Sequence, residues 1–270
     1  MKTFVGSATS EWLVMLEKII KMGYYAAPRG QNIVELLATQ ITLDMEYPVV
    51  AVASRKLGYK FMAAEAYWIL TGDDRVENIA PYSKTIANFS DNGVTFDGAY
   101  GPMIKQQLDY VVEALVKDND SRQAVLTIWR PSPAPSKDIP CTVSIQFLLR
   151  DGYLHCIDTM RSSDIWLGVP YDVFNFSMLS LQVALALRAR GVWVQLGNLT
   201  LQAGSQHLYV RNREAADEAL AHDATAFDAS VPITVDMFSN QEHHLSWLKQ
   251  LRETGVNRFY EDQCNGSSSY

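Results

Sequence analysis

Residues able to attack or hold a nucleotide lie close together in the second half of this 270-residue chain. Cys141 carries a thiol that can act as a nucleophile toward an electrophilic carbon. Arg161 and Ser162 place a cation beside a hydroxyl, a combination that binds phosphate through charge-assisted hydrogen bonds. Asp172 supplies a carboxylate in a segment with glycine and proline. The set predicts a site for a phosphorylated substrate.

Each of these residues also has a structural interpretation. A lone cysteine is most often a buried structural residue, and on its own Cys141 favours that interpretation over a thiolate stabilised by a nearby arginine. Arg161 fits a surface salt bridge equally well, and Asp172 fits a cap on the following helix. His207 and Tyr209 share one face of a strand, where a hydrogen-bonded core histidine is the commoner outcome.

Glu65 is the exception. It is the only charge in the apolar segment 61–70, which we predict to be a buried helix. A carboxylate in such a place is costly unless it is paired or functional. Glu65 therefore predicts a functional group without support from any other residue.

The elements that position these residues follow from periodicity and from turn residues. Helical spacing marks residues 10–22, begun by Ser10 and ended by Gly23, and also 103–116. Asp151-Gly152 joins two strands into a hairpin. The further expected elements are a helix or strand at 34–43, strands at 48–53, 124–129, 142–150, 153–160 and 192–202, and helices at 61–70, 174–191, 214–221 and 242–252.

Helices and strands alternate without a repeat or a linker, so we predict one α/β or α+β domain over residues 1–262. Residues 263–270 are predicted to be a disordered tail. The formal net charge of −7 argues against a broad nucleic-acid surface. No apolar run is long enough to span a membrane, and no signal peptide is visible. Three cysteines without metal-ligand spacing predict a reducing, cytoplasmic compartment and no metal site.

Taken in order, these motifs resemble those of the thymidylate synthase superfamily over about two thirds of the chain. Glu65-Ala66-Tyr67-Trp68 is similar to a Glu-x-x-Trp helix of the family, and Tyr100-Gly101-Pro102 to another conserved segment. Asp120-Ser121-Arg122 is similar to the segment whose arginine reaches the partner's phosphate. The remaining matches are Arg29, Cys141, Arg161, Ser162, Asp164, Gly168, Pro170, Asp172, His207 and Tyr209.

The resemblance implies a large bent mixed β-sheet covered by helices, dimerising through a sheet face. It also implies methylenetetrahydrofolate as co-substrate and Cys141 as the nucleophile toward ring carbon 6 of a pyrimidine. Glu65 would position water and move protons. The other implied roles are phosphate binding by Arg29, Arg161, Ser162 and the partner's Arg122, sugar binding by His207 and Tyr209, further substrate contacts by Asp164 and Gly168, and folate contacts by Tyr82 and Asp164.

Several positions depart from the synthase pattern. Asp172 replaces an asparagine, Thr142 a histidine, Met160 a glutamine and Gln123 a second arginine, and the hydrophobic closing tail is not visible. Four features instead resemble phage deoxycytidylate hydroxymethylases. They are Cys-Thr, Met-Arg-Ser-x-Asp, the aspartate ten residues after the serine, and Trp-Arg-Pro-Ser at residues 129–132.

The aspartate has a chemical reason. Cytosine presents an amino donor beside a ring nitrogen, so a carboxylate can accept from the amino group and support a proton on the nitrogen. Asp172 therefore predicts dCMP as substrate and 5-hydroxymethyl-dCMP as product, in a phage-infected or other bacterial cytoplasm. The alternatives are a dUMP hydroxymethylase or thymidylate synthase, a CMP hydroxymethylase, and a non-catalytic nucleotide- or RNA-binding relative.

Overall fold

The structure is a computed structural model that describes residues 5–221 and 224–264. Its centre is a seven-stranded sheet in the order β1-β2-β7-β5-β4-β3, with β6 beside β7. The sheet is mixed, since β7 pairs antiparallel with β2 and parallel with β5. The strands are β1 Tyr24–Ala26, β2 Ile33–Asp44, β3 Val125–Thr127, β4 Thr142–Arg150, β5 Tyr153–Met160, β6 Ser163–Asp164 and β7 Gln195–Tyr209.

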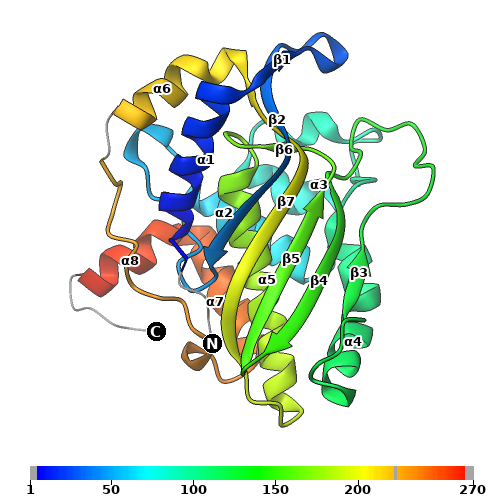
Figure 1. The fold of residues 1–270 in the computed structure, drawn as a ribbon. Helices are drawn as coiled ribbons and strands as arrows, with labels where there is room; N and C mark the ends of the chain where they lie inside the picture. Colours follow the sequence, from blue (N-terminus) through cyan, green and yellow to red (C-terminus); the bar gives the residue numbers. More distant parts are fainter. Residues whose placement is uncertain (1–4, 222–223, 265–270) are drawn as a thin grey trace.

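The helices gather on one side of this sheet (Figure 1). They are α1 Ala8–Met22, α2 Tyr59–Leu70, α3 Val76–Ile79, α4 Tyr100–Lys117, α5 Val169–Ala189, α6 Arg213–Ala221, α7 Gln241–Thr254 and α8 Val256–Cys264. Short 3₁₀ turns cover Pro28–Gly30, Ala53–Arg55, Ala80–Tyr82, Ile86–Phe89, Val210–Asn212 and Val235–Met237. Helix α5 packs on β5 and β7, and α2 in turn packs on α5 and α7. Among the described helices, none is long and apolar enough to cross a membrane.

Burial alternates along β5. Leu154, Cys156, Asp158 and Met160 are buried against the helices, while the residues between them are partly exposed. In the described part of the chain no helix covers that second face (Figure 1). Leu37, on β2, is 62% exposed. The sheet therefore presents a broad, partly apolar face to the outside.

Most expected elements are present, and the differences have local causes. Residues 34–43 form strand β2, which settles the choice left open by their pattern. Residues 48–53 are not a strand: they cross the core as irregular chain, with Val49 and Val50 almost fully buried. Helix α1 begins earlier than expected, because Ser7 and not Ser10 caps it. Helix α8 was not expected and includes residues 263 and 264 of the predicted tail, whereas 265–270 lie outside the described residues.

Candidate active site

Cys141 lies one residue before β4, where the β4–β5 hairpin brings it beside Arg161. Arg161 Nη2 lies 3.9 Å from Cys141 Sγ, and the same side chain donates to the carbonyls of Pro140 at 2.9 Å and Ile139 at 3.0 Å. These bonds fix the guanidinium against the segment that carries the thiol. Arg161 and Cys141, twenty residues apart in sequence, therefore form one unit.

The surroundings of the Cys141 thiol oppose its ionisation. Burial raises the pKa of Cys141 above its ordinary value, and although Arg161 lowers it, the carboxylates of Asp172 and Asp138 raise it further. The expected stabilisation of the thiolate by arginine is thus real but smaller than the effect of burial. Attack by Cys141 requires that the proton leave as the substrate binds.

Cys141 opens onto a hollow of about 200 Å³, which we call the cysteine hollow. One wall is apolar and aromatic, and the other carries carboxyl, amide and phenol groups, a combination typical of ligand sites. Its lining residues are Glu65, Trp68, Ile69, Ile86, Phe89, Phe96, Gly98, Ala99, Tyr100, Asp138, Ile139, Pro140, Cys141, Asp172 and Asn175.

Glu65 projects from α2 into the cysteine hollow, where Asn175 of α5 donates to its Oε2 at 2.8 Å. Burial raises the pKa of Glu65 to about 7, with a smaller contribution from Asp172, while the bond from Asn175 lowers it. Near neutral pH this carboxyl can therefore both give and take a proton. Asn175 Oδ1 is buried and has no partner among the described residues, so an acceptor remains available beside Glu65.

Asp172 lies in the first turn of α5 and faces the cysteine hollow. In the described chain its side chain caps no helix N–H, so the capping alternative is wrong. Burial and, to a smaller extent, the charge of Asp164 together raise the pKa of Asp172 to about 7. Gly168 lies against it: a Cβ there would stand 3.1 Å from Asp172 Oδ2. Gly168 thus leaves room for the carboxyl.

A second hollow, which we call the arginine hollow, adjoins the first at Ile139. Arg29 stands at its rim in a left-handed conformation, with φ of 54°. Two cations, two serine hydroxyls and a histidine-tyrosine pair surround the space, which suits a phosphorylated sugar. Its lining residues are Ala26, Pro28, Arg29, Ile33, Glu35, Trp129, Ile139, Arg161, Ser162, Ser205, His207 and Tyr209.

His207 and Asp164 interact beneath the arginine hollow. Burial lowers the pKa of His207, and the carboxylate of Asp164 opposes that change. Asp164 Oδ1 accepts from the backbone N–H groups of Trp166 and Leu167, both at 2.9 Å. His207 Nδ1 is buried without a partner in the described residues, so this nitrogen is available to a ligand, while the ring also bonds the backbone of Ser205.

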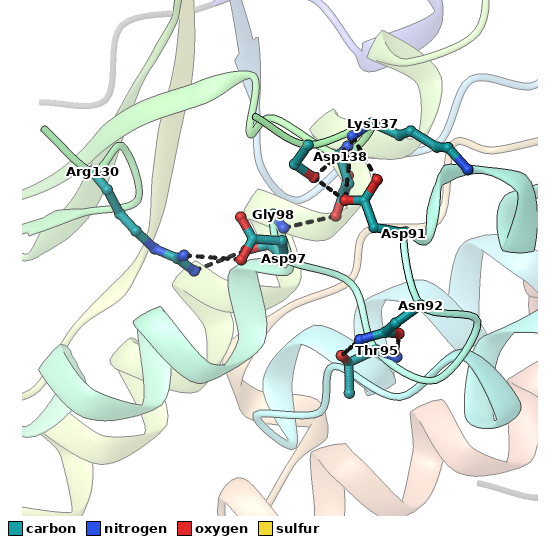
Figure 2. Close-up of polar contacts among 9 residues, drawn as sticks. Asp91, Asn92, Thr95, Asp97, Gly98, Arg130, Lys137 and Asp138 are labelled. Carbon is teal, nitrogen blue, oxygen red and sulfur yellow. Dashed lines mark hydrogen bonds and ion pairs between the residues drawn. The ribbon is translucent and has the colours of Figure 1, made fainter. Parts of the chain in front are cut away.

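Two loops meet at the rim of the cysteine hollow and hold the segment that leads to Cys141 (Figure 2). Arg130 donates to the Asp97 carbonyl at 2.8 Å, and the Gly98 N–H donates to Asp138 Oδ2 at 2.8 Å. Asp91 accepts from the Lys137 N–H at 3.1 Å. Because Gly98 and Asp138 line the hollow, these bonds set its shape on the side of the thiol.

Four predicted site residues line neither described hollow: Asp164 and Gly168, which lie beside His207 and Asp172, and Tyr82 and Arg122. Tyr82 donates to Glu253 Oε1 at 2.7 Å and does not line the cysteine hollow as described. Ile86 and Phe89, which follow Tyr82 in the chain, line the cysteine hollow instead. Arg122 is exposed and lines neither described hollow.

Sequence reasoning missed Asn175 as a site residue. It follows Asp172 by three positions on α5, and residues three apart on a helix are neighbours on one face. That spacing is the signal that identifies it.

Comparison with known proteins adds two findings. A family model described as thymidylate synthase matches residues 10–244. The chain is also similar to a protein of Bacillus phage SP01 named deoxyuridylate hydroxymethyltransferase, with 29% identity over 233 residues. The aligned part covers 78% of this chain and 59% of the phage protein, so the chain spans less than two thirds of that relative.

Proposed function

The chain belongs to the thymidylate synthase family, and from this membership we propose that it is a pyrimidine nucleotide 5-hydroxymethyltransferase that acts on dCMP. The observation that carries the proposal is the shared cysteine hollow, in which Cys141 and Asp172 face the same space. A nucleophile for ring carbon 6 and a carboxyl for the amino edge of the base are thus within one ligand site.

The nucleotide would lie across both hollows. Its phosphate would meet Arg29, Arg161 and Ser162 in the arginine hollow, and its sugar would meet His207 and Tyr209. The base would then enter the cysteine hollow past Ile139, which lines both spaces. Since Arg161 also lies beside the thiol, phosphate binding and alignment of the nucleophile depend on one side chain.

Cys141 would add to carbon 6 of the base, forming a C–S bond and leaving carbon 5 as a nucleophile. Methylenetetrahydrofolate, when bound, supplies the one-carbon unit. The apolar wall of Trp68, Ile86 and Phe89 offers a surface for its ring system. Carbon 5 would lose its proton and tetrahydrofolate would be released before water adds. Glu65, with a pKa of about 7, would hold the water that becomes the new hydroxyl and would accept its proton. The unpartnered Asn175 Oδ1 gives that water an acceptor within the described site. The C–S bond would then break, which releases Cys141 and restores the aromatic ring.

Asp172 would read the base. In its neutral form the carboxyl accepts from the cytosine amino group and donates to the ring nitrogen; ionised, it accepts from the amino group and pairs with a protonated ring nitrogen. Both states fit cytosine. Only the neutral state fits uracil, where the carboxyl must donate to the oxygen and accept from the ring N–H. Because burial brings the pKa of Asp172 to about 7, cytosine is favoured more strongly at higher pH.

A dUMP hydroxymethylase is the second candidate, because the phage relative is named for deoxyuridylate. Incubation with methylenetetrahydrofolate and dCMP, dUMP or CMP in separate reactions distinguishes the candidates by the mass of the product. We expect a hydroxymethyl product from dCMP and none from Cys141→Ser. Dihydrofolate and a methylated product from dUMP would instead identify a thymidylate synthase, and this result would overturn the proposal.

We also propose that the chain forms a homodimer through the uncovered face of the sheet. The support is the partly exposed second face of β5 and the exposed Leu37 of β2. Arg122, which lies apart from both described hollows of its own chain, would then reach the phosphate of the partner. Sedimentation of a monomer only, at micromolar concentration, would contradict this part.

A further inference from the structure

Asp158 is a buried carboxyl that the proposed reaction does not use. It lies on β5 and is 0% exposed. Its Oδ2 lies 3.4 Å from Thr142 Oγ1, and its Oδ1 has no partner in the described chain. Burial raises the pKa of Asp158 well above its ordinary value, and the charge of Asp172 raises it further. A polar group with one long hydrogen bond is costly in a core, and an apolar residue would be more stable at this position.

Thr142 connects Asp158 to the reacting groups. It follows Cys141 directly, is fully buried, and donates its backbone N–H to Tyr100 Oη at 3.2 Å. Tyr100 lines the cysteine hollow. The β4–β5 pairing shifts register between Thr142 and Ser144, and such a bulge redirects the strand next to it. Thr142 therefore sets the direction of the backbone immediately after the nucleophile Cys141.

The register explains why Asp158 can reach Thr142. Thr142 pairs with Met160 across the hairpin, and Asp158 lies two residues before Met160 on the same buried face. Diagonal neighbours of this kind are within reach of each other's side chains. Asp158 lines neither described hollow, so it acts on the site through its neighbours: the hydrogen bond to Thr142 and a charge interaction with Asp172.

We propose that Asp158 is a positioning residue that holds Thr142 by its hydroxyl and thereby fixes Cys141 and Tyr100 in the geometry of the covalent step. The inference rests on the proposed function in that it takes Cys141 as the nucleophile. It explains why the core retains an imperfectly bonded carboxyl at this position: the alignment of the thiol depends on it.

Two substitutions test the role. Asp158→Leu removes the hydrogen bond and keeps the branching at Cγ, and Asp158→Asn keeps a donor and an acceptor. We expect Asp158→Leu to melt at or above the parent Tm while kcat falls about 10- to 100-fold, the cost of a small misplacement of reacting groups. The KM for the nucleotide should stay within about threefold, because the phosphate and sugar contacts are intact. Asp158→Asn should restore most of kcat.

Thr142→Val is the matched variant on the other side of the hydrogen bond. It should reproduce the loss of kcat, and the double variant should lose little more than either single one, because both remove the same interaction. Losses that multiply in the double variant would overturn the inference.

A second readout does not depend on the substrate. The rate at which iodoacetamide alkylates Cys141, followed by mass spectrometry of its peptide, should change at least about threefold in Asp158→Leu. An unchanged rate, or a loss of kcat equal to the loss of folded protein, would overturn the inference. If the parent instead modified no pyrimidine nucleotide, the proposed function would fail, while alkylation would still report on the placement of the thiol.

Discussion

Replacing Asp172 with asparagine should make the stability of the protein less dependent on pH. Burial, together with Asp164, raises the pKa of this carboxyl from 3.8 to about 7. The folded protein therefore holds a proton that the unfolded chain releases near pH 4. Asparagine keeps the shape of the side chain and cannot ionise, so the exchange isolates the effect of this proton.

The sign follows from proton linkage. Stability associated with a raised pKa is fully present below the unfolded value, near pH 4, and is lost as the pH rises through about 7. At about 1.4 kcal/mol for each pH unit, the loss is at most about 4 kcal/mol. Asp172 keeps some contact with water in the cysteine hollow, and this screening reduces the expected loss to about 2 kcal/mol.

Urea unfolding at pH 5 and pH 8 measures this effect. The free energy of unfolding of Asp172→Asn, relative to the parent, should rise by about 1 kcal/mol between the two pH values, because part of the loss has already occurred below pH 5. Asp109→Asn is the matched control, because its carboxyl is exposed on α4 and its replacement should leave the pH dependence of the parent unchanged. If the free energies of unfolding of Asp172→Asn and the parent differed by the same amount at both pH values, the pKa of Asp172 would not be raised in the folded protein.

Two further predictions concern catalysis and assembly. Glu65→Gln should lower kcat by about 100-fold or more and leave the alkylation of Cys141 unchanged, since it removes only a general acid-base group. Glu253→Gln is the control, because Glu253 lies outside the cysteine hollow. A kcat near that of the parent in Glu65→Gln would contradict the role of Glu65. At low substrate concentration, Arg122→Ala and Cys141→Ser should each be nearly inactive alone, and mixing them should restore up to about a quarter of parent activity if sites are shared across a two-fold dimer. No recovery after subunit exchange, verified with tagged chains, would refute the shared site.

Local pattern predicted much of the fold. The hairpin around Asp151-Gly152 is present, with both turn residues at positive φ, and helices α4 and α7 follow their apolar spacing. Residues 48–53 were misassigned because burial of an irregular segment also produces an apolar run. Helix α5 begins at Val169, five residues earlier than expected. Pro170 hides that start, although proline is favoured in a first helical turn.

The site was predictable where motifs carry it and not where tertiary contacts create it. Cys141, Glu65 and Asp172 line one hollow, as the resemblance implied. The sequence did not identify Asp158 as a buried residue. In a strand of alternating pattern, nothing in the sequence shows whether a lone polar residue faces the core or solvent. The raised pKa of Cys141 likewise depends on burial, which the neighbouring residue types do not specify.

The release of tritium from carbon 5 of dCMP and of dUMP, measured at pH 8 with methylenetetrahydrofolate, tests most directly whether Asp172 selects the base attacked by Cys141. We predict faster release from dCMP, a hydroxymethylated product, and a reversal of this preference in Asp172→Asn. Faster release from dUMP by the parent, or a preference that Asp172→Asn leaves unchanged, would contradict the reading of the base by Asp172.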